Sequence, residues 1–239
     1  MNTTTSRKTF VLVHGAWHGG WCWRRVADLL ERGGHKAFTP TLTGLGERSH
    51  LMSGNINLDT HIADVVNVLK WEDLSDIVLV GHSYGGWPIS GAVEHCHERI
   101  ASIVYLDAFV PADGQKPLDV ASEFARKGTL EAIAKGEVSR KSPPAAVFHV
   151  NEKDQPWVDG KLTPQPVGVM LQAIKLTGAI ERVPKKTYIR APKYPQPTFD
   201  ANYQEKKADP TWRTYEVACG HDVMIDMPAW LVDVLLEVS

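Results

Sequence analysis

The stretch IVLVGHSYGG, residues 77–86, decides the expected fold. Its first four residues are aliphatic, which is typical of a central strand that is buried on both faces. The rest, Gly81 to Gly86, matches the pattern G-x-S-x-G and is followed by helix-compatible residues through His97. This order of strand, sharp turn and helix projects the serine side chain from a strained backbone. The flanking glycines allow neighbouring backbone segments to pass close to the serine. We therefore predict that Ser83 is a nucleophile.

Apolar runs alternate with helix-period segments on both sides of this stretch, which predicts a parallel sheet with crossover helices. The strands are expected at residues 10–13, 36–39, 77–81, 100–106, 187–190 and 213–217. Helices are expected at residues 23–30, from about 229 to 236, and over residues 58–71, where Ile62, Val65, Val66 and Leu69 fall on one face. The expected fold class is α/β, with a mostly parallel sheet of about six strands flanked by helices.

The alternation stops after Phe109. Residues 110–184 mix short helical pieces with prolines, among them Pro143 and Pro144. We interpret residues 110–184 as a small cap inserted between two strands of the sheet. A length of 239 residues suits one large domain, so the expected organisation is a single domain over residues 1–239.

Composition excludes several classes of partner. The 26 basic and 28 acidic residues nearly balance and form no basic stripe, so no nucleic-acid partner is expected. No run of eighteen apolar residues and no signal-like N-terminus is present, so we expect no membrane association and a cytoplasmic location. The three cysteines, Cys22, Cys96 and Cys219, are scattered, which argues against a disulfide framework and a metal cluster. No metal or cofactor is expected.

Two further turns complete a candidate catalytic site. His221 follows the last predicted strand on a glycine-containing turn, as a general base that comes after its nucleophile in the chain would. The chain has ten histidines, and the alternative is that His221 is a surface residue without catalytic function. The turn after the first strand, together with the residue after Ser83, is expected to supply two backbone N–H groups to an oxyanion hole. These donors are Ala16 and Tyr84, whereas the side chain of His14 is expected to pack under the turn.

The segments FVLVHGAWHGGWCW, TLTGLGERSHL, GHSYGG, YLDAFVP and CGHDVMIDMP make the chain resemble an α/β-hydrolase over nearly its whole length. It is most similar to the small-capped branch of plant methylesterases, hydroxynitrile lyases and bacterial esterases. The segments FHVNEKDQPWVD and CGHDVMIDMP are also similar to bacterial hydrolases of aromatic carbamates such as methyl benzimidazole carbamate. Two departures narrow the activities that the resemblance implies. Asp222 stands where the lyases carry a lysine that stabilises cyanide, which disfavours lyase activity. Ser83 stands where haloalkane dehalogenases carry an aspartate nucleophile, which excludes dehalogenase activity.

The resemblance also implies a carboxylate that orients His221, commonly in the loop after a late strand. Here that loop holds Ala191, Pro192, Lys193 and Tyr194 instead. We predict Asp107 as the acid, because it ends the strand beside that of Ser83 and haloalkane dehalogenases place an acidic residue at the matching point. Asp200 is the alternative. Asp222 is adjacent to His221 and should diverge from it, and Asp226 suits a helix cap.

Eight tryptophans are many for this length, and several aromatic residues lie near the catalytic turns. Core packing explains Trp21 and Trp23. The residues expected to line a substrate pocket are Trp17, Trp87, Phe109, Phe148, Trp157 and Tyr194. Such walls suit a flat aromatic substrate.

These features predict a serine-dependent esterase or carbamate hydrolase that cleaves small, aromatic carboxylic esters or carbamates through an acyl-enzyme. The alternatives are a hydrolase of lactones of the acyl-homoserine-lactone type, a lyase for C–C or cyanohydrin bonds, and a non-catalytic receptor for small molecules. The expected partner is a small-molecule substrate, and the protein is expected to be a monomer or a homodimer.

Overall fold

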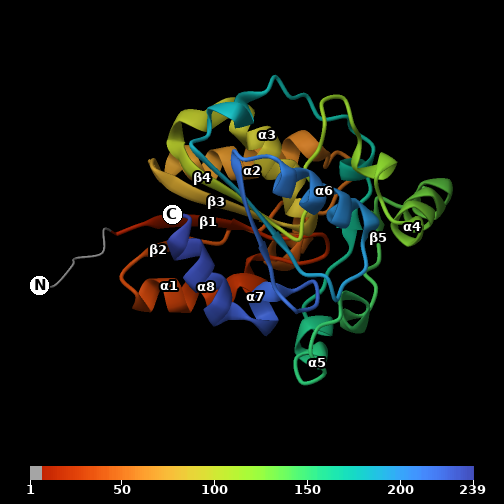
Figure 1. Ribbon diagram of the computed structural model, residues 1–239. Coiled ribbons are helices and arrows are strands. Elements are labelled where there is room, and N and C mark those ends of the chain that lie inside the picture. The colour runs from red at the N-terminus through yellow and green to blue at the C-terminus, as the bar shows by residue number, and fades with distance from the viewer. Residues whose placement is uncertain (1–6) are drawn as a thin grey trace, which may run out of the picture.

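The computed structural model describes residues 7–239 and contains a six-stranded parallel sheet of order β2-β1-β3-β4-β7-β8 (Figure 1). The strands are β1 (Thr9–Val13), β2 (Lys36–Phe38), β3 (Ile77–His82), β4 (Ile100–Leu106), β7 (Lys185–Arg190) and β8 (Trp212–Glu216). Each neighbouring pair is parallel. The α/β fold class and the six strands predicted from the sequence are therefore confirmed, with ends that differ by one or two residues.

Helices cover both faces of the sheet (Figure 1). α1 (Arg24–Arg32) and α8 (Pro228–Glu237) contact each other below the sheet in this view, and α2 (Leu58–Trp71) and α3 (Gly86–Cys96) contact each other above it. Side chains alternate between the two faces of a strand, so Val78 and Val80 of β3 join the core on the α1 side while Leu79 joins the core on the α2 side. The central strand is buried on both faces, as its uninterrupted apolar run predicted.

Helix α2 buries the face that its periodicity predicts. Ile62, Val65 and Leu69 are buried, and the helix begins with a capping box in which Asn57 and Thr60 exchange hydrogen bonds. Ile62 packs against Gly91 of α3, where an added Cβ would lie 2.2 Å from the Ile62 Cδ1 atom. The glycine thus allows α2 and α3 to approach closely and holds α3 behind the turn that carries Ser83.

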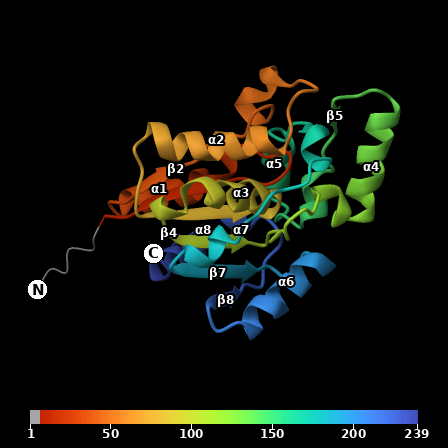
Figure 2. The same cartoon turned by 90° about the horizontal axis from the view of Figure 1, so that it is seen from above.

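Between β4 and β7 the chain leaves the sheet. This part carries α4 (Glu123–Ala134), β5 (Ser139–Arg140), α5 (Gln155–Asp159) and β6 (Gln165–Pro166), and β5 pairs with β6 in a small antiparallel sheet. In both views α4 lies beyond one end of the main sheet, and in Figure 1 α5 lies below the same end (Figures 1 and 2). We call residues 110–184 the cap segment and keep the limits that were predicted from the sequence.

The remaining helices are α6 (Pro197–Ala208), which packs on β7 and β8, and the single turn α7 (Val223–Asp226). Short 3-10 helices are η1 (Gly20–Trp23), η2 (Gly46–Leu51), η3 (Ser83–Gly85), η4 (His97–Arg99), η5 (Pro117–Asp119), η6 (Ala145–Phe148), η7 (Gly168–Met170) and η8 (Ala179–Arg182). Within residues 7–239, every helix is too short or too polar to span a bilayer.

Candidate active site

Ser83 occupies the strained turn that the sequence predicts. It lies between β3 and α3 with a φ of 54°, a left-handed conformation that few non-glycine residues adopt. The glycines around it are required by close contacts. A Cβ on Gly81 would lie 2.7 Å from the Gly85 carbonyl oxygen, and one on Gly15 would lie 2.9 Å from the Ser83 Cβ. The turns after β1 and β3 therefore touch at the serine.

Asp107 and His221 meet at the same edge of the sheet. Asp107 directly follows β4, is fully buried and has a φ of 43°. Its Oδ2 atom accepts a hydrogen bond from His221 Nδ1 at 2.6 Å. Since a carboxylate next to Nδ1 holds the ring proton on that nitrogen, the other ring nitrogen, Nε2, is left free to accept a proton.

The second oxygen of Asp107 is held by the chain that follows β7. Asp107 Oδ1 accepts hydrogen bonds from Arg190 Nη1 at 2.6 Å and from the Ala191 backbone N–H at 3.0 Å. Strands β4 and β7 are neighbours in register, with Leu106 opposite Ile189, which places these donors beside the carboxylate. Arg190 is not among the residues predicted from the sequence. The available signal was an arginine directly after Tyr188 and Ile189 at the end of a predicted strand, because a guanidinium that is buried there needs an acidic partner.

The other carboxylates considered from the sequence have different partners. Asp200 has a side chain that is 57% exposed and pairs with Arg190. Asp226 accepts hydrogen bonds from Asn151, and Asp222 pairs with His18. Of the four carboxylates, the structure therefore brings Asp107 to the His221 ring, as we predicted.

A buried ion pair connects the Ala16 turn to the His221 turn. Asp222 Oδ2 lies 3.0 Å from His18 Nε2, and His18 Nδ1 donates to the Ala16 carbonyl at 2.8 Å. Burial alone would lower the pKa of His18, but the Asp222 charge outweighs it and raises that pKa above its ordinary value. Burial likewise opposes ionisation of Asp222, yet the His18 charge and hydrogen bond lower its pKa to about 2. This pair holds both turns in place, and it was not predicted from the sequence.

The predicted oxyanion turn is held by the cap segment. Trp17 has a φ of 64°, and its N–H donates to Gln165 Oε1 at 2.9 Å. Its carbonyl accepts from the Thr163 N–H at 2.9 Å. The Trp17 amide is therefore occupied, while Ala16 and Tyr84 both line the cavity around Ser83. The assignment of the Ala16 and Tyr84 amides to an oxyanion hole stays a prediction.

His14 has the structural role expected from the sequence. Its Nδ1 atom bonds the Gly15 carbonyl at 2.8 Å, and its Nε2 atom accepts from the Leu42 N–H at 3.0 Å. Complete burial lowers its pKa to about 3. His14 is therefore a neutral ring that supports the turn.

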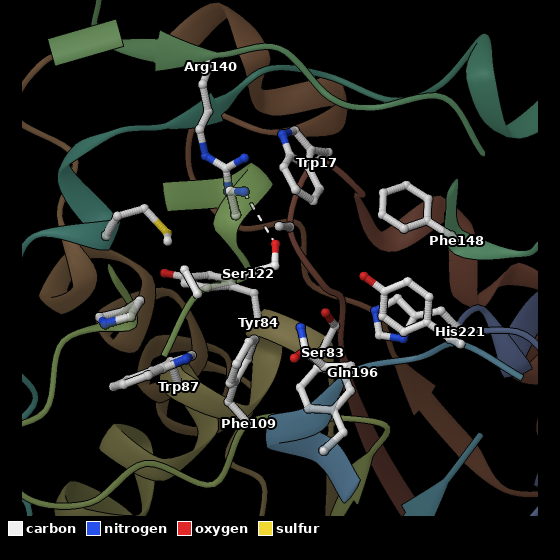
Figure 3. A pocket seen from close by; sticks show the side chains of 17 residues that line it. Trp17, Ser83, Tyr84, Trp87, Phe109, Ser122, Arg140, Phe148, Gln196 and His221 are labelled. Carbon is white, nitrogen blue, oxygen red and sulfur yellow. Dashed lines mark hydrogen bonds between the residues drawn. The ribbon is translucent and has the colours of Figure 1, made fainter. Parts of the chain in front are cut away.

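Ser83 and His221 line one cavity of about 70 Å³ (Figure 3). Of the six predicted pocket residues, five line it: Trp17, Trp87, Phe109, Phe148 and Tyr194. Trp157 packs edge-on against Trp21, with ring centroids 5.2 Å apart, and lies between two cationic side chains outside this lining. Expecting Trp157 in the pocket was wrong, because α5 turns this ring toward η1. The cavity also contains polar residues that the sequence analysis missed, namely Ser122, Arg140 and Gln196.

Within the part of the chain that the structure describes, three or more His, Cys, Asp or Glu side chains do not gather anywhere in a way that could hold a metal ion. Ionisable residues of the site instead pair with one another, as Asp107 does with His221.

A parallel sheet with a serine on the turn after β3 and a histidine after β8 defines a hydrolase fold, and comparison with known proteins agrees. Residues 10–234 match the alpha/beta hydrolase family, and the chain belongs to this family. It is 39% identical over 95% of its length to a carbendazim hydrolyzing esterase of Nocardioides sp. (strain SG-4G), of which 97% is covered.

Plant relatives match a smaller part. Methylesterase 1 of Arabidopsis thaliana is 34% identical over 55% of this chain and 51% of its own length. Among solved structures, an extracellular alpha/beta-hydrolase from a Paenibacillus species superposes with a TM-score of 0.82 at 24% identity, covering 97% of this chain and 99% of that one. The resemblance to hydrolases of this branch is thus confirmed for family and fold.

Proposed function

We propose that this protein is a serine hydrolase that cleaves small carboxylic esters or carbamates with an aromatic part. The observation that carries the proposal is the hydrogen bond from His221 to the buried Asp107, because His221 lines an aromatic cavity together with Ser83. The relative that is 39% identical is named for the hydrolysis of carbendazim, which supports an aromatic carbamate or ester as substrate.

In the proposed reaction, His221 Nε2 takes the proton of the Ser83 hydroxyl, whose oxygen attacks the substrate carbonyl carbon. Asp107 keeps the proton on Nδ1 and stabilises the imidazolium that forms. The Ala16 and Tyr84 amides stabilise the oxyanion. The alcohol or amine leaves with the proton from His221, and water then hydrolyses the acyl-enzyme by the same steps.

The first step needs a small movement. No hydrogen bond joins Ser83 to His221 among the side chains in Figure 3, so the hydroxyl must turn toward Nε2 when substrate binds. Catalytic hydrogen bonds of this kind commonly tighten only in the substrate complex. The buried ion pair with His18 keeps Asp222 anionic, and a negative charge beside His221 disfavours a leaving cyanide. We therefore do not propose cyanohydrin cleavage.

The test is a panel of p-nitrophenyl esters, aryl carbamates and acyl lactones. We expect turnover of the esters and carbamates, and a loss of several orders of magnitude in kcat for Ser83→Ala. A fluorophosphonate should label Ser83 in the wild type. Ser142→Ala is the matched control, because Ser142 lies outside the cavity and its hydroxyl bonds the Pro143 carbonyl. Near-normal turnover by Ser83→Ala would refute the proposal, and hydrolysis of lactones alone would replace it with the lactonase alternative.

A further inference from the structure

Arg140 is a buried cation that extends from the cap segment into the active-site cavity (Figure 3). Only 6% of the residue is exposed, and its guanidinium carbon lies 4.3 Å from the centroid of the Trp17 ring. Its Nε atom is buried without a hydrogen-bond partner. Among residues 7–239, the ion pairs of the structure involve other side chains, so Arg140 has no carboxylate partner there.

Backbone pairing and ring packing hold Arg140 in its position. Arg140 lies opposite Gln165 in the β5–β6 pair, and Gln165 also fixes the Trp17 N–H. Trp17 and Arg140 therefore form one stacked wall of the cavity, anchored to the predicted oxyanion turn. In Figure 3 this wall lies on one side of the cavity and Trp87 and Phe109 lie on the other.

Charge balance in the cavity points to a ligand. Burial lowers the pKa of Arg140 to about 10, so the side chain is still protonated at neutral pH. A buried charge is costly unless it is paired, and the neutral neighbours of Arg140, among them the Trp17 ring, compensate for only part of that cost. The residues that line the cavity include no Asp, Glu or Lys, so Arg140 meets no protein anion there. A guanidinium pairs best with a planar carboxylate, by two parallel hydrogen bonds.

We propose that Arg140 binds a carboxylate carried on the aromatic part of the substrate, away from the carbonyl that Ser83 attacks. The preferred substrates are then esters or carbamates of aromatic acids or alcohols that bear a second, anionic group. This inference rests on the proposed function for turnover, but the binding of an aromatic carboxylate can be measured without it.

The turnover experiment compares monomethyl isophthalate and monomethyl terephthalate with their neutral analogues, in which a carboxamide replaces the free carboxylate. We expect the wild type to favour at least one anionic ester by about tenfold or more in kcat/KM, mainly through KM. Arg140→Gln should abolish this preference, and Arg140→Lys should restore part of it. The readout is a ratio: kcat/KM for the anionic ester divided by kcat/KM for p-nitrophenyl acetate, which has no second group, should fall by about tenfold or more in Arg140→Gln and by less in Arg140→Lys.

The binding experiment uses Ser83→Ala, which keeps the cavity and removes turnover. Calorimetry should detect isophthalate or terephthalate binding more tightly than the matching monoamide, and Arg140→Gln in the same background should remove the difference. Equal affinity for acid and amide, or an acid preference that survives Arg140→Gln, would overturn the inference. A loss in Arg140→Gln that is equal for anionic and neutral esters would also overturn it, in favour of a structural role on Trp17. If no ester is hydrolysed by the wild type while binding of the acid still depends on Arg140, the proposed function fails and this inference stands.

Discussion

The replacement of Asp107 by Asn probes the part of the site that the sequence left most open. The carboxylate takes three hydrogen bonds: Oδ2 accepts from His221 at 2.6 Å, and Oδ1 accepts from Arg190 at 2.6 Å and from Ala191 at 3.0 Å. An asparagine has one acceptor oxygen, which the two donors on the β7 side will hold. Its NH₂ group then faces His221 and forces the ring proton onto Nε2.

With the proton on Nε2, His221 cannot accept the serine proton, so the chemical step should slow by about 10⁴-fold in kcat, the size of effect seen when a triad carboxylate is replaced by its amide. Breaking a buried ion pair also destabilises a protein by about 3–5 kcal/mol. A domain has a total stability of about 5–15 kcal/mol, so the variant should fold but melt at a lower temperature. KM should change little, because Asp107 does not line the cavity.

The assay is kcat for p-nitrophenyl acetate at a temperature well below the melting point of each variant, which circular dichroism gives. Asp200→Asn is the matched control, because Asp200 also contacts Arg190 but is 57% exposed. It should lower kcat by less than about threefold, as removal of a solvent-exposed ion pair has small effects. A folded Asp107→Asn with near-normal kcat, or a larger loss in Asp200→Asn, would refute the assignment of Asp107.

Two further predictions concern the framework of the site. Burial lowers the pKa of His14 to about 3, that of His61 to about 4 and that of His82 well below its ordinary value, so all three stay neutral in the folded state while the unfolded chain binds their protons below pH 6.5. The stability that these neutral rings confer is present above pH 6.5 and is lost as the pH falls toward their folded-state pKa values. Each ring should therefore lower the free energy of unfolding by about 1.4 kcal/mol per pH unit near pH 5, or about 4 kcal/mol per pH unit for the three. Urea titrations at several pH values measure this slope. In His61→Gln we expect the slope to decrease by about 1.4 kcal/mol per pH unit, and an unchanged slope would contradict the prediction. Gln165→Leu removes the acceptor of the Trp17 N–H. We therefore expect the free energy of unfolding to fall by about 1–3 kcal/mol and kcat to decrease. An unaltered melting temperature would show that this hydrogen bond does not hold the turn.

Local rules were enough to place Ser83 and His221, because each lies on a turn directly after a strand. A parallel sheet brings such turns to one edge whatever the intervening chain does. Asp107 followed from the same rule, as the end of the strand next to that of Ser83. The positions of Ser83, Asp107 and His221 thus depend only on the order of the strands in the sheet.

The cap segment contains the contacts that the sequence could not supply. Arg140 reaches the cavity through a strand of two residues, and its partner strand brings Gln165 to Trp17 across 148 positions of sequence. Strands this short carry no periodicity that predicts a register. From the sequence, Trp157 is recognisable only as an aromatic residue of the cap segment. The direction of α5 determines that the Trp157 ring packs on Trp21.

The loop after β7 connects these observations. The resemblance to the family implies a carboxylate there, but Tyr194 stacks on the His221 ring at a centroid distance of 4.4 Å, and its carbonyl accepts from Arg190 Nη2. Asp107 reaches His221 from the neighbouring strand, about 4.8 Å away in the sheet, and the Arg190 charge compensates for its burial. A carboxylate that follows β4 therefore leaves the loop after β7 free to cover the His221 ring with an aromatic side chain. Since Tyr194 also lines the cavity, the position of the carboxylate and the shape of the cavity are physically linked in this protein.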